Sequence, residues 1–557
     1  MASNHLQGQL APSDQSSDSS TVVMPGNKAR SSLPGQTHQP KRRATPFAIF
    51  LGGIASIGGF VFGYESGQIS GFLQMSDFLQ RFGQRNATEQ EIFYFSPARQ
   101  GTIVALLSAG TLVGCLGSGW ICDTIGRRFT ISAAAFFYII GVIIEITSST
   151  VWPQFAMGRF VAGLGIGALS VAVPMYQSES VPKNIRASVT SSYQLLITLG
   201  IWIAYMVNWG TESTYRNSAQ WRIPNGLSAL WAIILGGGIL FMPESPRFAY
   251  RRGKTEAARK TLARLHGVAA DSPLVEEEIA EIQAQITEEE KLEKAKWIEC
   301  FMVKDRMLYR TLLGMILQAG QQLTGANFFF YYGTTIFKSV GLSNSYVTSI
   351  ILGTVNVVAT IVSVAVVNRI GRRKPMIIGA LWMFMCFMVY SFVGSLVLRK
   401  DEDNGPAGAV LIVFTCLFIC AFATTWGPLV WTIVAELYPP RYRAQCMALA
   451  TSSNWLFNFL ISFFTIFITD KIHYWYGMVF GGSCLILAFI VYFFVMETKD
   501  RSLELIDYMY VNHVNPITSA SWNEGDAVPG HKQEVKKDEA SAPPMLAHEE
   551  EQSPATV

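Results

Sequence analysis

Three glutamines in an apolar stretch are the residues of this chain best suited to binding chemistry. Gln318, Gln321 and Gln322 are three and four positions apart, so a helix carries their amides on one face. The stretch from about 312 to 337 is long enough to cross a bilayer, which takes about 20 residues, and the residues 324–327 (TGAN) weaken the helix within it. An unpaired amide in hydrocarbon costs several kcal/mol. The amides therefore face either a wet cavity, where they suit a polyol, or a partner helix.

Glu65 is the second candidate, because an acid within an apolar span costs roughly 2.5 kcal/mol or more and by default marks a proton relay or an ion pair. Arg159, in another apolar span, is the partner that we expect. Proton transport would then alternate a salt bridge with a neutral carboxylic acid, since the guanidinium favours the ionised form. The alternative is an ion pair with a structural role only. Glu145 lies near the outer end of its span, and we expect it at the interface.

Composition places these residues in a membrane. Hydrophobic residues make up 50% of the 557 residues. Charged residues make up only 15%, whereas soluble domains average about 25%. The apolar residues come in blocks of membrane-spanning length, which indicates a polytopic membrane protein.

Several other functions are excluded by composition and motifs. The net charge of +3 comes with no basic block interleaved with aromatics, so we expect no nucleic acid partner. The eight cysteines are scattered without a CxxC pair, so we expect neither a disulfide scaffold nor a metal site. The chain shows no nucleotide loop and no nucleophile and base in a soluble domain. We therefore expect a protein that is not an enzyme and needs no cofactor.

The apolar blocks predict twelve transmembrane helices. They lie at approximately 47–71, 100–121, 129–149, 154–175, 188–208, 224–242, 312–337, 346–367, 375–397, 408–435, 445–468 and 476–496. We therefore expect an all-α polytopic membrane protein. Its expected parts are a tail (1–45), a six-helix half (46–246), a helical linker (247–310), a second six-helix half (311–497) and a second tail (498–557). Both tails are polar, and we expect them to be largely disordered.

Basic residues in the short connections predict the orientation, because positive residues are retained inside. They occupy alternate connections, on the same side as the basic run at 41–43: Arg127, Arg128, Lys183, Arg186, Arg369, Arg372, Arg373, Lys374, Arg441 and Arg443. We expect this side, with both termini and the linker, to be cytoplasmic. Asn86 begins the sequon NAT in an outer connection, so we expect it to be glycosylated.

The two halves repeat each other. DTIGRR (123–128) recurs as NRIGRR (368–373), and ESVPKNIR (179–186) recurs as ELYPPRYR (436–443). Two six-helix halves in one orientation match the parallel-repeat design of alternating-access transporters. We expect the charged residues to form cytoplasmic latches that close in one state and break in another, the alternative being that they only enforce topology. These gate residues are Asp123, Arg127, Arg128, Glu179, Arg186, Arg372, Arg373, Glu436 and Arg443.

Together with further segments, these repeats resemble the sugar porter family of the major facilitator superfamily, and within it the fungal hexose transporters. The matching segments are GGFVFGYESGQISG (58–71), GSGWICDTIGRR (117–128), GRFVAGLGIG (158–167), PMYQSESVPKNIRA (174–187), QLLITLG (194–200), PESPR (243–247), QQLTGAN (321–327), NRIGRR (368–373), WGPLVW (426–431) with AEL after it, NW (454–455) and ETKDRSLE (497–504). They cover the chain from about 50 to 505 in family order. The chain departs from the family pattern at Ala187, Asn368 and Asp500, where Gly, Asp and Gly are usual.

The resemblance also implies which residues touch the sugar: Gln194, Gln321, Gln322, Asn327, Asn356, Trp431, Asn454 and Asn458. Each is an amide or an indole in or near the middle of a span, and polar residues there face cavities. Trp431 adds a flat apolar face on which a pyranose ring can pack. In related proton cotransporters an acid, usually Asp, at the position of Glu65 pairs with the arginine at the position of Arg159. Uniporters tend to have a neutral residue there.

The resemblance implies a major facilitator fold and transport of a monosaccharide such as glucose. We expect a sugar:proton symporter of the plasma membrane that works as a monomer in the lipid bilayer. A facilitative uniporter, a transporter-like glucose sensor and a porter of a disaccharide, a polyol or a quinate-like acid remain open. Transporter-like sensors carry long C-terminal extensions, and the tail here has only about 60 residues, which argues against a sensor.

Overall fold

The computed structural model describes residues 45–85, 93–291, 296–339, 345–397, 405–439, 441–499, 501 and 503–522. Within these residues the chain is almost entirely helical, and the all-helical prediction is confirmed. Besides helices and their connections, the described residues contain a short strand pair, in which β1 (Gln84–Arg85) runs antiparallel to β2 (Phe93–Tyr94). The predicted glycosylation site at Asn86 lies between these strands, outside the described residues.

Six long helices form the N-terminal bundle. They are α1 (Pro46–Phe72), α3 (Pro97–Ile125), α4 (Arg127–Thr147), α5 (Trp152–Ser180), α6 (Lys183–Thr214) and α7 (Ala219–Leu240). The short α2 (Ser76–Phe82) follows α1. Buried aliphatic and small side chains, among them Leu51, Ala134 and Leu169, form an apolar core inside this bundle.

A second set of helices forms the C-terminal bundle, after a group of linker helices. The linker elements are α8 (Pro246–Arg251), α9 (Thr255–His266), α10 (Pro273–Lys291) and the 3-10 turns at Trp297–Phe301 and Lys304–Arg306. The bundle contains α11 (Met307–Leu323), α12 (Ala326–Ser339), α13 (Ser345–Ile370), α14 (Arg373–Phe392) with a π turn at Val393–Val397, α15 (Gly405–Thr424), α16 (Trp426–Leu437), α17 (Arg443–Ile472) and, after a 3-10 turn at His473–Trp475, α18 (Tyr476–Phe494). After it come α19 (Leu503–Val511) and a 3-10 turn at Ser519–Ser521.

Ten helical ranges of the described residues are long and apolar enough to cross a membrane. One of them, Arg443–Phe494, contains both α17 and α18. Another, Pro406–Leu437, contains α15 and α16 and corresponds to the tenth predicted span. The seventh predicted span is divided between α11 and α12, which have 17 and 14 residues and are too short to be counted singly. These divisions explain the difference between ten ranges and the twelve spans predicted from the sequence.

Small residues allow the helices of the N-terminal bundle to approach closely. A Cβ at Gly110 on α3 would collide with the carbonyl oxygen of Phe160 on α5, and a Cβ at Gly163 on α5 would collide with that of Leu107 on α3. Hydrophobic burial gives little drive between helices in lipid, where association depends on close packing of this kind. The glycine-rich segment GRFVAGLGIG therefore fixes the position of α5 against α3.

Two helices of the C-terminal bundle are broken near their middle. Between α11 and α12, Gly325 has φ +88°, a left-handed conformation that glycine adopts without strain. A side chain there would also collide with Phe387 and Phe480. Between α15 and α16, Thr425 has φ −126° and ψ −79°, which is not helical. The weak helix predicted at 324–327 is therefore present as a break, with the three glutamines directly before it.

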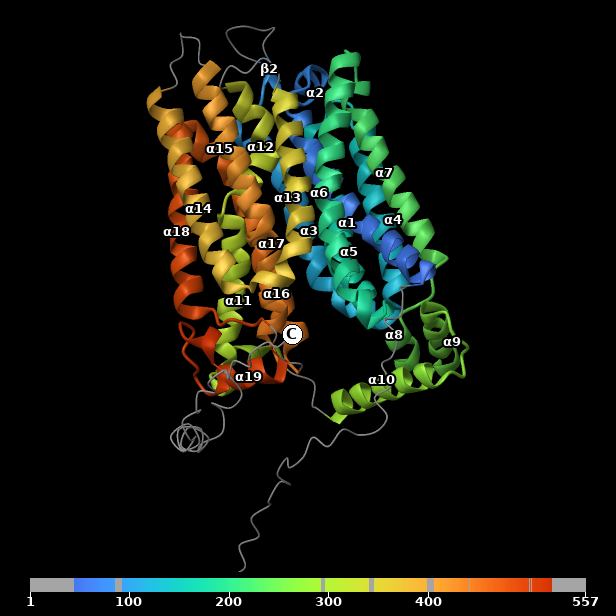
Figure 1. Cartoon of the computed structure of the whole chain (residues 1–557). Helices are drawn as coiled ribbons and strands as arrows, with labels where there is room; N and C mark the ends of the chain where they lie inside the picture. Colours follow the sequence, from blue (N-terminus) through green and yellow to red (C-terminus); the bar gives the residue numbers. More distant parts are fainter. Residues whose placement is uncertain are drawn as a thin grey trace, which may run out of the picture. The chain divides into compact units, whose positions relative to one another are not determined.

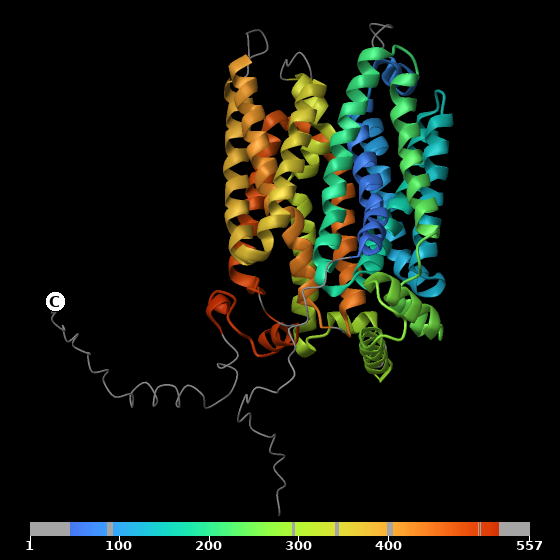
Figure 2. The ribbon, with the colours of Figure 1, turned by 45° about the vertical axis from the view of Figure 1, so that its right-hand side comes forward.

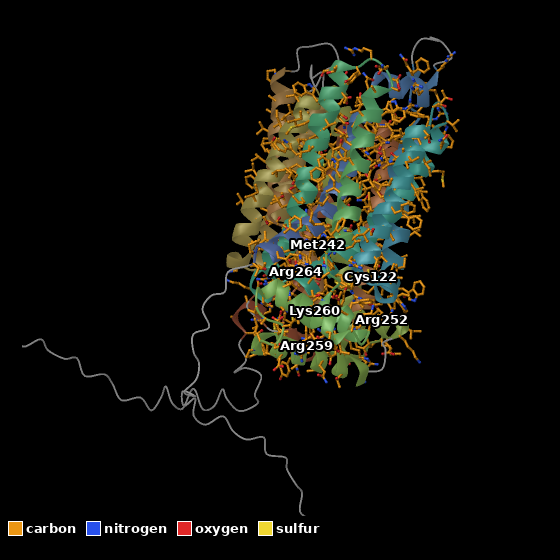
Figure 3. All side chains as sticks on the ribbon, turned by 90° about the vertical axis from the view of Figure 1, so that its right-hand side faces the viewer. Cys122, Met242, Arg252, Arg259, Lys260 and Arg264 are labelled. Atoms are coloured by element: carbon orange, nitrogen blue, oxygen red, sulfur yellow. The ribbon has the colours of Figure 1, made fainter. Side chains whose placement is uncertain are left out.

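The linker helices and the short hairpin mark the two ends of the molecule's helical part. Figure 1 shows α8, α9, α10 and α19 at one end, which we call the linker end, and α2 and β2 at the other, which we call the hairpin end. Figure 2 shows the N-terminal bundle, in blue to green, beside the C-terminal bundle, in yellow to red. Figure 3 shows the basic residues Arg252, Arg259, Lys260 and Arg264 gathered at the linker end. There the side chain of Thr45 donates to the carbonyl of Leu265, which fastens the start of α1 to α9 (2.6 Å).

The two bundles are joined by hydrogen bonds in the half of the molecule toward the hairpin end. The hydroxyl of Ser70 on α1 lies 3.0 Å from that of Thr334 on α12. The hydroxyl of Tyr346 on α13 donates to the carbonyl of Gly71 on α1 (2.9 Å). Since α1 begins at the linker end, Ser70 and Gly71 in its last turn lie at the hairpin end. These contacts hold α1 against the C-terminal bundle there.

Candidate functional site

Amide side chains meet where α11 and α12 pack against α17. Asn454 on α17 lies at their centre, because its Nδ2 donates to Gln318 Oε1 and Gln321 Oε1, each at 2.8 Å. Its Oδ1 accepts from Gln322 Nε2, also at 2.8 Å. We call the following set the amide cluster: Gln318, Gln321, Gln322, Asn327, Asn454 and Asn458. In this conformation the glutamines thus bind a partner helix, which is one of the two arrangements that the sequence left open.

Gln321 also holds a neighbouring helix. Its Nε2 donates to the carbonyl oxygens of Trp426 and Gly427, at 3.0 and 2.9 Å, in the first turn of α16. Trp426 is fully buried and donates its Nε1 to the carbonyl of Met376 on α14 (2.9 Å). Gln321 therefore joins α11, α16 and α17, so a structural role accompanies any role in binding.

Asn458 connects the amide cluster to the N-terminal bundle. Its Oδ1 accepts from the hydroxyl of Ser108 on α3 (2.6 Å), and its Nδ2 donates to Gln322 Oε1 (3.2 Å) and to the hydroxyl of Tyr331 (3.2 Å). Sequence reasoning missed Ser108 and Tyr331. The position of Tyr331, four residues after Asn327, was a usable signal, because it places both side chains on one helix face. No such signal marks Ser108.

Asn327 is the amide of the cluster that a ligand can reach most easily. It is half-buried, whereas the other five are buried. Its Nδ2 donates to Gln322 Oε1 at 2.5 Å. Gln318 Nε2, in contrast, is buried and has no hydrogen-bond partner among the described residues. A buried N–H without a partner is costly, so a ligand oxygen or a water bound there would stabilise the cluster.

The other three residues implied for sugar contact lie outside this hydrogen-bond network. Gln194 on α6 and Trp431 on α16 are half-buried, and Asn356 on α13 is buried with 3% of its surface exposed. None of the hydrogen bonds within the described residues joins them to the amide cluster. Their contact with a sugar therefore stays a prediction.

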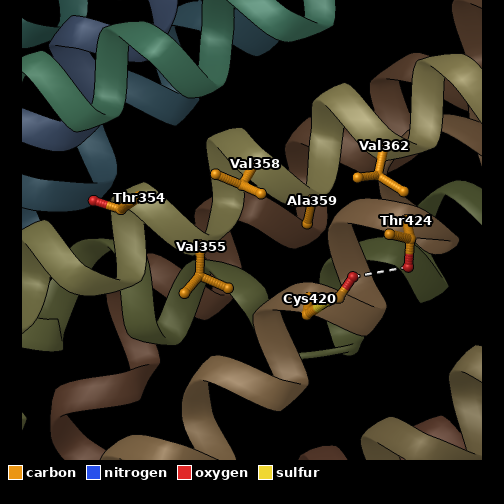
Figure 4. Close-up of a pocket in the computed structure, with 7 residues that line it drawn as sticks. All are labelled: Thr354, Val355, Val358, Ala359, Val362, Cys420 and Thr424. Atoms are coloured by element: carbon orange, nitrogen blue, oxygen red, sulfur yellow. Dashed lines mark hydrogen bonds between the residues drawn. The ribbon is translucent and has the colours of Figure 1, made fainter.

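A pocket of about 280 Å³ lies between α13 and α15, beside α6 (Figure 4). Its lining is apolar apart from Thr354, Thr424 and Cys420. Thr354 Oγ1 already accepts from Trp202 Nε1 (2.9 Å) and donates to the carbonyl of Ile350 (2.8 Å). Thr424 Oγ1 donates to the carbonyl of Cys420 (2.8 Å). A polyol would find few free partners in this pocket, so the amide cluster is the better sugar site.

Glu65 on α1 and Arg159 on α5 form a buried ion pair, as the sequence predicted. Arg159 Nη1 lies 2.9 Å from Glu65 Oε1, and the two side chains are 1% and 0% exposed. Glu65 Oε2 accepts two further hydrogen bonds, from Gln68 Nε2 (2.6 Å) and from the hydroxyl of Tyr138 on α4 (2.7 Å). The position of Gln68, three residues after Glu65, was again a signal of a shared helix face that sequence reasoning missed.

Neighbouring helices bury Glu145, whereas its expected depth at the membrane interface stays a prediction. The residue is near the end of α4, but its side chain is 0% exposed and Nδ2 of Asn225 on α7 donates to its Oε2 (3.0 Å). Position along a helix does not show which face the neighbouring helices cover, and here α5 and α7 cover the face that carries the acid.

Within the described residues no three His, Cys, Asp or Glu side chains are grouped as a metal site requires.

One known protein family matches most of this chain. The family model described as "Sugar (and other) transporter" matches residues 51–510. The chain belongs to the sugar transporter family. Members of this family are transporters, so the prediction of a non-enzyme is confirmed.

The sugar transporter has several curated relatives among fungal proteins. It is 44% identical over 475 residues to the low-affinity glucose transporter of Kluyveromyces lactis, covering 84% of this chain and 83% of the relative. It is 43% identical to the low-affinity glucose transporter HXT3 of Saccharomyces cerevisiae, over 84% of this chain and 83% of that one. It is 42% identical to the high-affinity fructose transporter ght6 of Schizosaccharomyces pombe, over 87% and 90%.

Solved structures share the fold of this sugar transporter. The proton:xylose symporter XylE bound to 6-bromo-6-deoxy-D-glucose aligns with a TM-score of 0.70 at 24% identity, covering 83% of this chain and 99% of that one. The inward open conformation of XylE from E. coli aligns with a TM-score of 0.68 at 23% identity, over 83% and 100%. The predicted major facilitator fold is therefore confirmed.

The predicted gate residues of the sugar transporter's first half lie together at the linker end. Arg127 is ion-paired with Glu179 (3.0 Å) and with Asp123 (3.1 Å). Arg186 donates to the carbonyl of Val181 (3.4 Å). In this conformation the carboxylate of Glu179, in the motif ESVPKNIR, is thus held by Arg127 from the motif DTIGRR.

The second half repeats this arrangement with its own residues. Arg372 is ion-paired with Glu436 (3.4 Å), and its backbone N–H donates to Glu497 Oε1 (2.9 Å). In the first half the backbone N–H of Arg127 donates to Glu244 Oε1 in the same way (3.0 Å). Glu244 and Glu497 are residues that sequence reasoning quoted within motifs but did not assign. Each carboxylate binds the N-terminus of a membrane helix, where negative charge is favourable.

The remaining gate residues bind main-chain carbonyl groups. Arg128 donates to the carbonyl of Met242 (3.1 Å), Arg373 to that of Tyr492 (2.5 Å), and Arg443 to that of Tyr438 (3.2 Å). These bonds tie the loops to the helix ends of the same half.

Proposed function

We propose that this sugar transporter moves a hexose such as glucose across the plasma membrane by alternating access and couples the movement to protons. The observation that carries the proposal is the ion pair between Glu65 and Arg159, because both groups are buried between helices that are long and apolar enough to cross a membrane. Charged groups at such positions mark proton or substrate pathways by default. The relatives named as glucose and fructose transporters support the choice of a hexose.

The amide cluster is the sugar-binding part of the proposal. Amides donate and accept hydrogen bonds, which suits the hydroxyl groups of a sugar. The cluster lies beside the break between α11 and α12, and discontinuous helices form binding sites in transporters. We propose that the following residues contact the sugar: Gln194, Gln321, Gln322, Asn327, Asn356, Trp431, Asn454 and Asn458. Asn458 also binds Ser108 of the other bundle, so sugar binding and bundle movement are linked at this residue.

The contacts between bundles support a state that is closed at the hairpin end. There Ser70 binds Thr334, and Tyr346 binds the carbonyl of Gly71. Opening toward the hairpin end must break these bonds. We propose that the linker end faces the cytoplasm, together with both termini, because the basic gate residues lie there and positive residues are retained inside. The ion pairs of Arg127 and Arg372 then form the proposed cytoplasmic gate, and we propose that the transporter works as a monomer.

A proton can act on this arrangement through Glu65. While it is ionised, Glu65 accepts from Arg159, Gln68 and Tyr138, which holds α1 against α5 and α4. Protonation removes the negative charge and weakens all three bonds, so the relative stability of the transport states depends on the proton. The solved structure named as a proton:xylose symporter shares this fold, which is in keeping with the proposal.

A facilitator is the second candidate, because one observation favours it. Both oxygens of Glu65 are fully partnered by three donors, as in an ion pair with a structural role.

Uptake of radiolabelled glucose by cells that lack their own hexose transporters tests transport, and competing fructose, xylose, maltose and quinate test the substrate class. Glucose uptake that fructose inhibits, and that xylose, maltose and quinate do not inhibit, supports the proposal. Failure to take up any hexose, with the protein at the cell surface, would contradict it.

A further inference from the structure

Glu145 is a second fully buried acid close to the Glu65–Arg159 pair. Its side chain packs on Gly158, the residue next to Arg159, so closely that a Cβ at Gly158 would lie 2.6 Å from Glu145 Cγ. Glycine at this position therefore makes room for the acid against α5. Glu145 has no role in the proton coupling through Glu65 proposed above.

Two amide side chains connect the two acids. Asn225 Nδ2 donates to Glu145 Oε2 (3.0 Å), and Asn225 Oδ1 accepts from Gln68 Nε2 (3.4 Å). Gln68 Nε2 in turn donates to Glu65 Oε2 (2.6 Å). All four side chains are 0% exposed. Glu65 and Glu145 thus belong to one network, in which Arg159 is ion-paired with Glu65.

The charges of this network do not balance if both acids are ionised. Two carboxylates and one guanidinium leave a net charge of −1, and an uncompensated buried charge costs several kcal/mol. One proton on either acid makes the network neutral. Glu65 receives three hydrogen-bond donors, one of them a guanidinium, whereas Glu145 receives one amide and its Oε1 has no partner among the described residues. The proton therefore belongs on Glu145 in this conformation.

The other ionisable groups around Glu145 are committed elsewhere. Arg222 on α7 donates to the carbonyl of Ser148 and to the hydroxyl of Ser218, each at 3.3 Å. Tyr138, on the same helix as Glu145, donates to Glu65, and Tyr64 on α1 donates to the carbonyl of Pro224 (3.1 Å). Among the described residues, Arg159 is thus the cation of this network.

We propose that Glu145 is a second proton-binding residue of this site, which holds a proton while Glu65 is ionised beside Arg159 and releases it when Glu65 becomes neutral. The proton that leaves Glu145 is the one that arrives at Glu65, so the network keeps one proton and no net charge. The guanidinium of Arg159 then always has one anionic partner. This inference deepens the proposed proton coupling and rests on it for its role in transport. The protonation of Glu145 itself can be measured without transport.

Infrared spectroscopy of the full chain in proteoliposomes tests the proposal, because a protonated carboxylic acid has its own carbonyl band, which shifts in heavy water. At neutral pH the wild type is expected to show such a band, and Glu145→Gln is expected to lose it. Glu65→Gln is also expected to lose it, because Glu145 must then ionise beside Arg159. Asp77→Asn is the matched control, since Asp77 is a buried acid that is ion-paired with Arg81 (2.6 Å) and should leave the band unchanged.

The measured bands and the sugar accumulation can contradict this inference and the proposed symport independently of each other. A wild-type band that stays at full intensity in Glu145→Gln, or in Glu65→Gln, overturns the inference. Sugar counterflow across the same vesicles shows that each variant is folded, and Glu65→Gln gives an independent test should Glu145→Gln not fold. A Glu145 band in a protein that never accumulates sugar would contradict proton symport and still support the protonation of Glu145. Accumulation of sugar without the band would support symport and overturn the inference.

Discussion

Arg159 Nη1 lies 2.9 Å from Glu65 Oε1, and this ion pair joins α5 to α1 with neither side chain more than 1% exposed. A buried ion pair contributes little net stability when it is replaced as a whole, but removal of one partner is strongly unfavourable. Protonation of Glu65 breaks this pair, even where Glu145 becomes the anion of the network in its place. The pair therefore makes the energy of this conformation dependent on a proton, which is the property that a proton-coupled transporter needs.

Arg159→Ala is expected to be more damaging than a neutral replacement of the acid. It leaves Glu65 buried without its cation, which costs about 3–5 kcal/mol when a buried pair is broken. We expect less folded protein in detergent extracts and no sugar accumulation. Arg159→Lys is the control, because it retains the charge. Equal yield and equal accumulation in wild type and Arg159→Ala would show that the pair has neither role.

Asn327→Ala and Gln321→Ala are expected to differ. Asn327 is half-buried and makes one described hydrogen bond, so its replacement should weaken sugar binding by about 1–3 kcal/mol with normal surface expression. Gln321 also holds Trp426 and Gly427 of α16, so its replacement should lower both affinity and surface expression. Competition binding and surface labelling measure the two effects. Unchanged affinity in Asn327→Ala would remove it from the binding site.

A chain that ends at Arg501 is expected to be less stable than the full chain. It lacks α19, whose Asp507 is ion-paired with Arg310 (2.5 Å), and whose Tyr510 ring lies 4.9 Å from the fully buried guanidinium of Arg310. Its loss uncovers that guanidinium and part of the apolar core. We expect the melting temperature of the purified protein to fall by a few degrees.

A chain that ends at Trp522 is the matched control for this truncation, because it retains α19 and the turns after it. It is expected to melt like the full chain. Two truncations that melt alike would show that α19 does not stabilise the C-terminal bundle.

Asn86 is expected to carry an N-linked glycan when the protein is made in a eukaryotic cell. The sequon NAT lies in the connection that the charge pattern places outside, and glycosylation requires luminal exposure. Glycosidase treatment should increase the gel mobility of the wild type and leave Asn86→Gln unchanged. A mobility shift that persists in Asn86→Gln would place the glycan elsewhere.

The membrane helices and the central ion pair could be predicted from the sequence, because apolar blocks and buried charges are local signals. Glu65 and Arg159 are both costly in lipid, so each was expected to need the other. The burial of Glu145 could not be predicted, since it depends on how α5 and α7 cover the residue, and Gly158 gives no such information in the sequence alone. The break after Leu323, in contrast, could be predicted, because the residues TGAN that follow weaken a helix.

Pairings over long distances were harder to predict. The motifs DTIGRR and ESVPKNIR indicated latches but not which residues pair, and Arg127, more than 50 positions away from Glu179, binds that carboxylate. Trp431 was selected for its aromatic face, whereas Trp426 is the fully buried tryptophan that anchors α16. The partner of a charged residue and the direction of a tryptophan depend on the rotation of each helix about its own axis. Packing between helices determines this rotation, and motif spacing does not show it.

The accumulation ratio of a non-metabolised hexose, with and without a protonophore, tests the account most directly when wild type is compared with Glu65→Gln. Glu65→Gln mimics the protonated acid permanently, so it is expected to exchange sugar across the membrane without concentrating it and to lose its response to external pH. The wild type is expected to concentrate the sugar until the protonophore is added. Wild type that never exceeds equilibrium would make the protein a facilitator with a structural ion pair, and a Glu65→Gln variant that still concentrates sugar would show that Glu65 does not carry the proton.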